Sequence, residues 1–201
     1  MTPIYHITHV DNLQSIVEHG CLWCDAQRIA QKIETVNIGH LHIKERRLKR
    51  SVPVAAKGFL GDYVPFNFCN RSVMLIAHHY GNVEGYSDGQ EPIVHLVSSA
   101  EAAMTTHKPW AFTDRHADLA YARFFANWAK RTEVDWDAMP LIWWKEKKEE
   151  RQAEFLVYDS FPWTCVEKIG VYNEAIAERT RQAIAKAKHQ PSVVVEKSWY
   201  Y

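Results

Sequence analysis

The stretch Glu154-Phe155-Leu156-Val157-Tyr158 is a run of β-forming residues that begins with a carboxylate. Branched and aromatic side chains at this density predict a strand. A carboxylate at the mouth of a buried strand is held rigidly and is partly removed from water, as functional acids often are. The alternative is a glutamate at the end of a strand that pairs with the neighbouring Arg151. The stretch therefore predicts a buried strand and makes Glu154 a candidate functional acid.

Further β-rich segments lie along the chain, with helices between them at irregular intervals. The sequence predicts strands at residues 3–8, 62–68, 92–97, 163–172 and 193–199, and helices at 11–20, 72–80, 118–131 and 173–188. The helix at 118–131 has the clearest pattern, because Tyr121, Phe124, Phe125 and Trp128 repeat at helical spacing. Residues 25–50 predict a loop with one or two helical turns. Few clean βαβ units occur, so an α+β fold with a largely antiparallel sheet is expected.

Length and composition exclude several classes of protein. The 201 residues suit a single domain, and the 24 basic and 24 acidic residues balance, so the chain does not coat nucleic acid by bulk charge. We expect no membrane span and no secretion signal. Four cysteines are too few for a disulfide framework and fit a reducing cytoplasm. Eight tryptophans are an unusual number, and tryptophan is typical of cores and of base-stacking surfaces.

Residues 43–50, Ile-Lys-Glu-Arg-Arg-Leu-Lys-Arg, gather five cations within seven positions of a neutral chain. Such a cluster suits a phosphate or pyrophosphate, which arginine can bind with two hydrogen bonds. The alternative is a solvated helix face with pairs such as Glu45 with Lys49. A second group, Asp114-Arg115-His116, either orients a substrate or forms a capped turn in which the aspartate accepts backbone N–H bonds.

No motif for a metal or for a nucleotide-binding loop is convincing. Cys21 and Cys24, followed by His40 and His42, have poor spacing for zinc, so no metal site is expected. The chain has no G-x-G-x-x-G, Walker, H-E-x-x-H or G-x-S-x-G motif. On residues alone, three classes stay open: a transferase, a non-catalytic module that binds single-stranded nucleic acid, and a metal-dependent nuclease or hydrolase.

Five segments in order carry a family resemblance that extends over essentially the whole chain. They are IYHITHVDNL (4–13), IKERR (43–47), DYVPF (62–66), FTDRH (112–116) and QAEFLV (152–157), together with the ending KSWYY (197–201). Together they resemble the DarT family, the DNA ADP-ribosyltransferase toxins of DarTG toxin–antitoxin systems.

The resemblance implies one ADP-ribosyltransferase domain over residues 1–201, with the fold of diphtheria toxin and the poly(ADP-ribose) polymerases. In that fold two small antiparallel sheets pack together and NAD lies in the cleft between them. The implied reaction transfers ADP-ribose from NAD to a base of single-stranded DNA and releases nicotinamide, with thymine N3 the favoured acceptor. Guanine, RNA or protein are alternative acceptors. The implied partner is a macrodomain antitoxin that removes the modification.

The resemblance also implies roles for individual residues. His6 and Thr8, with Ile7 between them, match the NAD-binding His-x-Thr, and Ser15 and Trp23 fall at further NAD-contacting positions. Residues 28–49 match a segment that covers NAD, and residues 116–154 match a loop that presents the acceptor. The residues expected to act in catalysis are Arg47 and Glu154, and those expected to contact DNA are His116, Lys145, Lys147, Lys148 and Arg151.

Two points of chemistry follow from these roles. Cleavage of the nicotinamide–ribose bond builds positive charge on the ribose, which an ionised Glu154 would stabilise, with Arg47 or Arg151 nearby to hold it ionised. The resemblance assigns loss of the thymine N3 proton to Arg47, although stabilising the resulting anion is easier for a guanidinium than accepting a proton. One departure is Asn67, which stands where relatives have a tyrosine, so any stacking by that ring is missing here.

Overall fold

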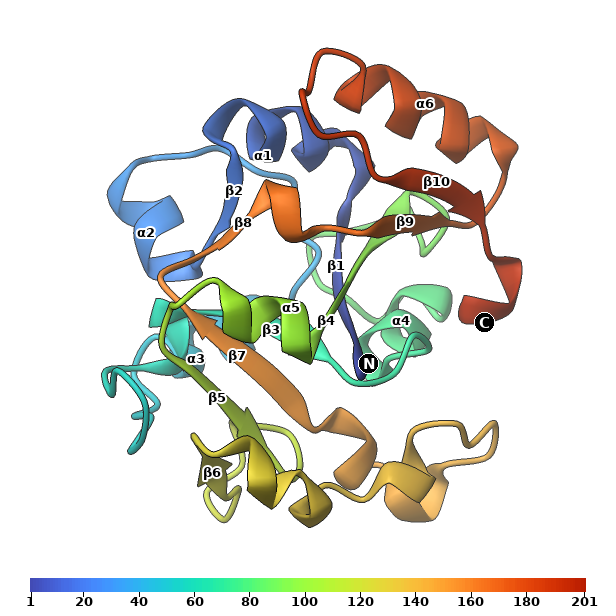
Figure 1. Cartoon of the computed structure of the whole chain (residues 1–201). Helices are drawn as coiled ribbons and strands as arrows, with labels where there is room; N and C mark the ends of the chain where they lie inside the picture. The colour runs from blue at the N-terminus through green and yellow to red at the C-terminus, as the bar shows by residue number, and fades with distance from the viewer.

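The computed structural model describes residues 1–201 as a mixed α/β structure built on one large sheet (Figure 1). The strands are β1 (Pro3–His9), β2 (Cys21–Trp23), β3 (Tyr63–Asn67), β4 (Ile93–Ser99), β5 (Trp110–Thr113), β6 (Phe124–Phe125), β7 (Glu154–Tyr158), β8 (Ser160–Pro162), β9 (Lys168–Val171) and β10 (Ser192–Val195). The helices are α1 (Leu13–His19), α2 (Asp25–Ala30), α3 (Leu41–Arg47), α4 (Val73–His79), α5 (Ala100–Thr105) and α6 (Glu174–Ile184).

The large sheet consists of two halves that meet at a single residue pair. Its strand order is β10-β9-β4-β1-β3-β7-β5-β6, and only the β10–β9 pair is parallel. β1 pairs with β4 along its whole length, whereas Tyr5 opposite Asn67 is the one register pair between β1 and β3. The expected α+β fold with two mainly antiparallel sheets is therefore confirmed as two four-stranded halves that share this narrow junction. β2 and β8 form a separate two-stranded sheet.

Helices and apolar strand residues enclose the main core. The largest cluster comprises 27 buried residues, to which β4, β7 and β9 and helix α6 contribute (Figure 1). Phe155 and Val157 of β7 are fully buried in this cluster, and Leu156, on the opposite face, is buried in another. β7 is therefore covered on both faces, which explains why the stretch that begins at Glu154 is apolar without alternation. No helix of the structure has the length and apolar character needed to cross a membrane.

The prediction of a helix at 118–131 is wrong. The structure instead has the short strand β6 and a 3₁₀ helix, Trp128–Glu133. The buried Asp114 carboxylate accepts the backbone N–H of Arg123 at 3.0 Å and its guanidinium at 2.9 Å, which takes a donor that a helix would use. Phe125 stacks on Phe112 of the adjacent strand. The aromatic side chains therefore lie on the edge strand β6 and in an irregular segment rather than on one face of a helix.

Other predicted boundaries shift because the chain turns earlier than its composition suggests. The strand expected at 163–172 is a 3₁₀ turn, Trp163–Cys165, followed by β9, and the strand expected at 193–199 ends with β10. The helix expected to reach residue 188 ends at Ile184. After it, the backbone N–H groups of Ala185 and Ala187 donate to the carbonyls three residues earlier, those of Gln182 and Ile184. Residues 25–50 contain two short helices, as expected.

Candidate active site

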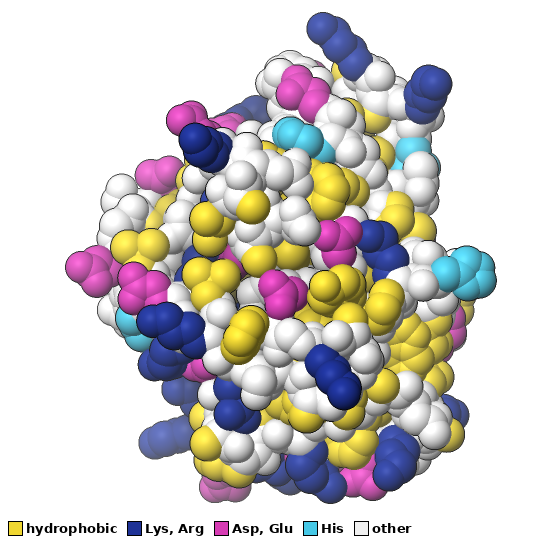
Figure 2. Space-filling model, turned by 90° about the vertical axis from the view of Figure 1, so that its left-hand side faces the viewer, with side chains coloured by type: hydrophobic (Ala, Val, Ile, Leu, Met, Phe, Trp, Pro, Cys, Tyr) yellow, Lys and Arg dark blue, Asp and Glu magenta, His cyan; other side chains and the backbone are white.

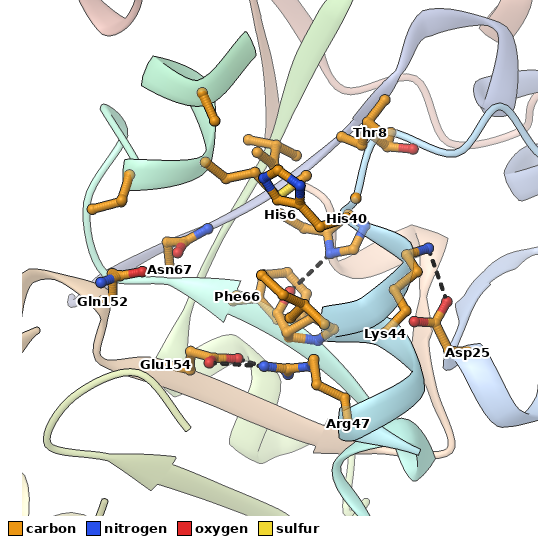
Figure 3. Close-up of a pocket in the computed structure, with 18 of the residues that line it drawn as sticks. His6, Thr8, Asp25, His40, Lys44, Arg47, Phe66, Asn67, Gln152 and Glu154 are labelled. Carbon is orange, nitrogen blue, oxygen red and sulfur yellow. Dashed lines mark hydrogen bonds and ion pairs between the residues drawn. The ribbon is translucent and has the colours of Figure 1, made fainter. Parts of the chain in front are cut away.

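A cavity of about 1170 Å³ opens beside the junction of the two half-sheets (Figure 3). β1, α1, β2, α2 and α3 line one part of it, and β3, α4, the segment 142–148 and Glu154 line the rest. Pockets for small ligands are commonly about 300–1,000 Å³. This cavity therefore has room for a dinucleotide together with part of a second substrate.

The centre of the site is an ion pair between Arg47, the last residue of α3, and Glu154, the first residue of β7. The guanidinium donates two hydrogen bonds to the carboxylate, Nη1 to Oε1 at 3.0 Å and Nη2 to Oε2 at 2.8 Å (Figure 3). The side chains are 12% and 7% exposed. Glu154 Oε1 also accepts the backbone N–H of Ala117 at 3.0 Å, and the Glu154 N–H donates to Thr113 Oγ1. The carboxylate is therefore fixed by two partners, Arg47 and the Ala117 N–H, and its cation is Arg47 rather than Arg151.

The ion pair determines the charge state of both groups. Burial alone would raise the pKa of Glu154, but the Arg47 guanidinium and the Ala117 N–H together hold that pKa below its ordinary value. Burial likewise opposes the charge of Arg47, and the Glu154 carboxylate raises the pKa of the guanidinium above its ordinary value. Both groups are therefore ionised at neutral pH.

Helix α3 is bound to the loop that precedes β6. Arg46 Nη2 lies 2.6 Å from Asp118 Oδ2, and Arg50 Nη2 donates to the carbonyls of Leu119 and Ala120. Lys44 pairs with Asp25 of α2 across 3.4 Å (Figure 3). Several cations of the basic cluster at 43–50 therefore bind α2 and the loop before β6 through ion pairs and hydrogen bonds. Lys and Arg side chains gather over the lower half of the face shown in Figure 2, which carries α2 and α3.

Gly61 allows α3 to approach the body of the protein closely. A Cβ atom at this position would lie 2.5 Å from Leu48 Cδ2 and 3.1 Å from Leu48 Cα, and Leu48 directly follows Arg47. We expect Gly61→Ala to displace the end of α3 and to lower turnover about tenfold, because small misplacements of a catalytic group are costly. Steady-state kinetics with the substrates that the resemblance implies, NAD and a thymine-containing oligonucleotide, measure this.

A second substitution controls for general damage. Gly61→Ala with Leu48→Ala removes the Cδ2 clash and should recover part of the lost turnover. Equal turnover of Gly61→Ala and the native chain would show that this close approach does not position Arg47.

All residues expected to contact NAD line this one cavity, namely His6, Ile7, Thr8, Ser15, Trp23 and Arg47. The His6 ring donates from Nδ1 to the Pro65 carbonyl at 2.8 Å, which leaves Nε2 as an acceptor. The Trp23 indole N–H is buried and has no partner in the chain. A buried donor without a partner is costly unless a ligand satisfies it, so this wall of the cavity fits a ligand rich in acceptors, as a dinucleotide is.

The residues expected to contact DNA divide into two groups. His116, Lys145 and Lys148 line the cavity. Lys147 lies outside the lining and pairs with Asp135 at 2.7 Å.

The expectation for Arg151 is wrong. This residue is 2% exposed, and its guanidinium donates to the carbonyls of Ala138, Met139 and Arg71, so it holds the 138–152 segment together and is not open to DNA.

The structure adds side chains that sequence patterns did not indicate. Trp143 is 92% exposed at the rim of the cavity, and Trp144 and Tyr201 line it with Arg71, whose guanidinium lies 4.2 Å from the centre of the Tyr201 ring. The high tryptophan content and the KSWYY ending were the available signals. Asn67 also lines the cavity, opposite Glu154 in the β3–β7 register.

No cluster of His, Cys, Asp or Glu has the geometry to hold a metal ion. The Cys24 thiol instead accepts the Gln27 N–H and caps α2.

A sheet-walled cavity with a buried carboxylate at the start of a strand agrees with the ADP-ribosyltransferase site that the family resemblance implies. Comparisons with known proteins define the class. Residues 5–201 match the family described as DarT, ssDNA thymidine ADP-ribosyltransferase. A DNA ADP-ribosyl transferase of Thermus sp. (strain 2.9) is 44% identical, and the match covers all of this chain and 96% of the relative. One of Escherichia coli O127:H6 is 29% identical over 98% of this chain and 93% of its own length.

Solved structures agree. Thermus sp. 2.9 DarT in complex with ADP-ribosylated ssDNA superposes with a TM-score of 0.94 at 44% identity, over all of this chain and 96% of that one. The same protein in complex with NAD⁺ gives 0.90 at 42% identity, over all of this chain and 98% of that one. The chain belongs to the DarT family of ssDNA thymidine ADP-ribosyltransferases.

Proposed function

We propose that this chain transfers one ADP-ribose from NAD to N3 of a thymine in single-stranded DNA and releases nicotinamide. The observation that carries the proposal is the buried, doubly hydrogen-bonded Arg47–Glu154 pair, which faces a cavity large enough for a dinucleotide and a base. NAD supplies an ADP-ribose group on a good leaving group, and family membership supports thymine as the acceptor.

Glu154 and Arg47 perform separate tasks in this proposal. The ionised Glu154 carboxylate stabilises the positive charge that develops on the ribose as the bond to nicotinamide breaks. Arg47 holds the carboxylate ionised and directed, and its positive charge stabilises the negative charge that develops on the thymine ring. His6, Thr8, Ser15 and Trp23, which line the same cavity, bind the dinucleotide.

The 142–148 segment carries the features that single-stranded DNA requires. Lys145 and Lys148 place positive charge at the cavity, and the exposed Trp143 presents an indole ring to an unpaired base. A single strand also spares the few kcal/mol needed to unpair and unstack a thymine from a duplex. We infer that DNA follows this rim and inserts one thymine toward Glu154.

This arrangement predicts a salt dependence that belongs to particular lysines. Replacing Lys145 and Lys148 by alanine should weaken binding of a single-stranded oligonucleotide and reduce the slope of log affinity against log salt by about 0.7 for each phosphate that a lysine no longer neutralises. Fluorescence anisotropy across a salt series measures both values. Lys186→Ala with Lys188→Ala, which removes the same charge from positions outside the cavity, should leave the slope unchanged. Equal slopes for both double variants would contradict the assignment.

The experiment that tests the proposed function incubates the protein with NAD and an oligonucleotide that contains one thymine. Mass spectrometry should show the gain of one ADP-ribose on that thymine, with release of an equal amount of nicotinamide. Three further incubations each offer a single alternative acceptor: a DNA oligonucleotide with guanine but no thymine, an RNA, or a protein. Modification of one of these in place of thymine DNA would overturn the acceptor, and absence of any NAD cleavage would overturn the reaction and favour a binding module.

The proposal extends to the biological partner and compartment. We infer that the chain acts as a toxin in the cytoplasm, where its four free cysteines stay reduced, and that a macrodomain antitoxin removes the modification. Incubation of the modified oligonucleotide with a DarG-type macrodomain should release ADP-ribose and restore the original mass. A product that resists this treatment would contradict the partner.

A further inference from the structure

The segment between α2 and α3 forms part of the cavity wall without secondary structure of its own. Residues 34–39, here called the strap, contribute Thr35, Val36, Ile38 and Gly39 to the lining. No backbone N–H or carbonyl of the strap bonds to another backbone group. Backbone polar groups of a folded chain are normally paired, so side chains must supply the missing partners. The side chains that do so determine how firmly this wall closes on a ligand.

Asn12, the last residue of the 3₁₀ turn that follows β1, supplies both partners of the Val36 backbone. Its Oδ1 accepts the Val36 N–H at 2.8 Å, and its Nδ2 donates to the Val36 carbonyl at 3.0 Å. These two bonds fix the orientation of the amide, because an N–H requires an acceptor and a carbonyl requires a donor. Asn12 is buried and lines the cavity. The strap is therefore fastened to the end of β1 by one carboxamide.

The second amide hydrogen of Asn12 fixes the role of the Thr8 hydroxyl. Nδ2 also donates to Thr8 Oγ1 at 3.0 Å, in a buried contact. Because this oxygen accepts from Asn12, the hydroxyl hydrogen of Thr8 is left for another acceptor. Thr8 lines the cavity and is one of the residues expected to contact NAD (Figure 3). The hydroxyl is thus offered to a ligand as a donor, and NAD is rich in acceptor oxygens.

The catalytic ion pair is held in place independently of Asn12. The Arg47 guanidinium is bound by Glu154, and helix α3 is tied to the loop before β6 through Arg46 and Asp118. The Asn12 side chain bonds only to Thr8 and Val36. A change at Asn12 should therefore loosen the wall that binds the dinucleotide and leave the catalytic pair in position.

We propose that Asn12 is a positioning residue for the NAD substrate. The inference rests on the proposed function. One carboxamide joins two parts of the dinucleotide site, because it holds the strap closed at Val36 and sets the Thr8 hydroxyl as a donor. Both amide hydrogens are used within the chain, so Asn12 acts on NAD through Val36 and Thr8. These contacts serve bound NAD before and during transfer alike, so their loss raises KM and leaves kcat nearly unchanged.

Two substitutions remove the donor function of Asn12 in different ways. Asn12→Asp keeps the shape of the side chain and an acceptor for the Val36 N–H, but a carboxylate cannot donate to the Val36 carbonyl and attracts the Thr8 hydroxyl hydrogen to itself. Asn12→Ala removes all three bonds and adds no charge. Each should raise the Kd and KM for NAD about tenfold and keep kcat at saturating NAD within about twofold of the native value.

Isothermal titration calorimetry with NAD in the absence of DNA gives the Kd, and steady-state kinetics with a thymine oligonucleotide give KM and kcat. Gln14→Ala, an exposed change on α1 whose side chain bonds only to Glu18, is the control and should match the native chain. Native NAD affinity in both Asn12 variants would overturn the inference. A fall in kcat as large as the rise in KM would also overturn it, since positioning of NAD alone does not slow the chemical step.

A double-mutant cycle tests whether Asn12 acts through Thr8. Thr8→Val removes the hydroxyl with little change of shape and should itself weaken NAD binding. Adding Asn12→Asp to Thr8→Val should cost less affinity than Asn12→Asp costs in the native chain, because the hydroxyl that it misdirects is already absent. Fully additive losses in the free energy of NAD binding would contradict the link between the two side chains.

Hydrogen exchange of the Val36 amide gives a readout without turnover. This N–H is bonded only to Asn12 Oδ1, so in Asn12→Ala it should exchange about tenfold faster or more, while the amides of β1 and β4 keep their native protection. Unchanged protection of Val36 would show that Asn12 does not fasten the strap. Failure of the native chain to bind or cleave NAD would overturn the proposed function itself, whereas cleavage of NAD without modification of thymine would overturn only its acceptor.

Discussion

We expect replacement of Glu154 by glutamine to lower the rate of DNA modification by about 1,000-fold. Glutamine keeps the shape of the side chain and its place at the start of β7 but loses the negative charge that stabilises the ribose in the proposed reaction. Removing one well-placed electrostatic group from a buried site commonly costs about 100-fold to 1,000-fold in rate. The expectation is for the upper end, because Glu154 is the carboxylate that Arg47 and the Ala117 N–H jointly hold ionised at this site.

The measurement must distinguish lost chemistry from lost folding. Glu154→Gln leaves the buried Arg47 without its counter-charge, and breaking a buried pair commonly costs about 3–5 kcal/mol of stability. Thermal unfolding of the variant should therefore be recorded beside its rate of nicotinamide release, with Glu18→Gln, an exposed change on α1, as the matched control. A folded Glu154→Gln that retains a tenth of the native rate would exclude the carboxylate from the chemistry.

We expect replacement of Arg47 by lysine to lower kcat/KM by about 100-fold. Lysine keeps the charge but replaces a planar, two-pronged donor by a single ammonium, so the two parallel bonds to Glu154 cannot both form. The carboxylate is then less well directed and less strongly ionised. Its pKa moves up toward or above the ordinary 4.5, because burial is no longer fully opposed.

The pH dependence gives this prediction its sign. In the native chain Glu154 is ionised above a pKa that lies below 4.5, so this group limits activity only in stronger acid. In Arg47→Lys the activity should begin to fall at a higher pH as the solution is acidified. The double variant Arg47→Lys with Glu154→Gln should be little worse than Glu154→Gln alone, since the two side chains act as a unit. Two results would show that the side chains act independently: losses of activity that add up in the double variant, or an activity of Arg47→Lys that falls in acid at the same pH as that of the native chain.

The sequence predicts the central strands β1, β3, β4 and β7 well, misses the short strands β2, β5, β6 and β8, and predicts the site only in part. β1, β4 and β7 could be predicted because strand periodicity and β-branched composition are local properties. The Arg47–Glu154 contact joins residues 107 positions apart, which no spacing rule predicts. The family resemblance supplied the two residues but left the cation beside Glu154 open between Arg47 and Arg151. The failed helix at 118–131 shows the converse. Its aromatic spacing is helical, yet the buried Asp114 takes the backbone of Arg123 and determines the local structure.

Charge patterns misled for a similar reason. Arg151 and Lys147 lie in one run of alternating charge, and the sequence does not show which member is buried. The structure buries Arg151 against three carbonyls and ties Lys147 to Asp135, which leaves Lys145 and Lys148 at the cavity. Conversely, residues 43–50 could be read as a phosphate site or a solvated face, and the structure uses several of these cations to join α3 to distant segments.

The separation between Arg47 and Glu154 also has a consequence for biosynthesis. A ribosome that adds about 5–20 residues per second needs about 5–20 s to pass from one of these residues to the other. During that interval the growing chain carries Arg47 and the dinucleotide-binding side of the cavity but no carboxylate. Sheets with such long-range pairing also assemble slowly. A nascent or prematurely terminated chain therefore lacks the Arg47–Glu154 pair, and the site is complete only after β7 has been made and has joined its neighbours.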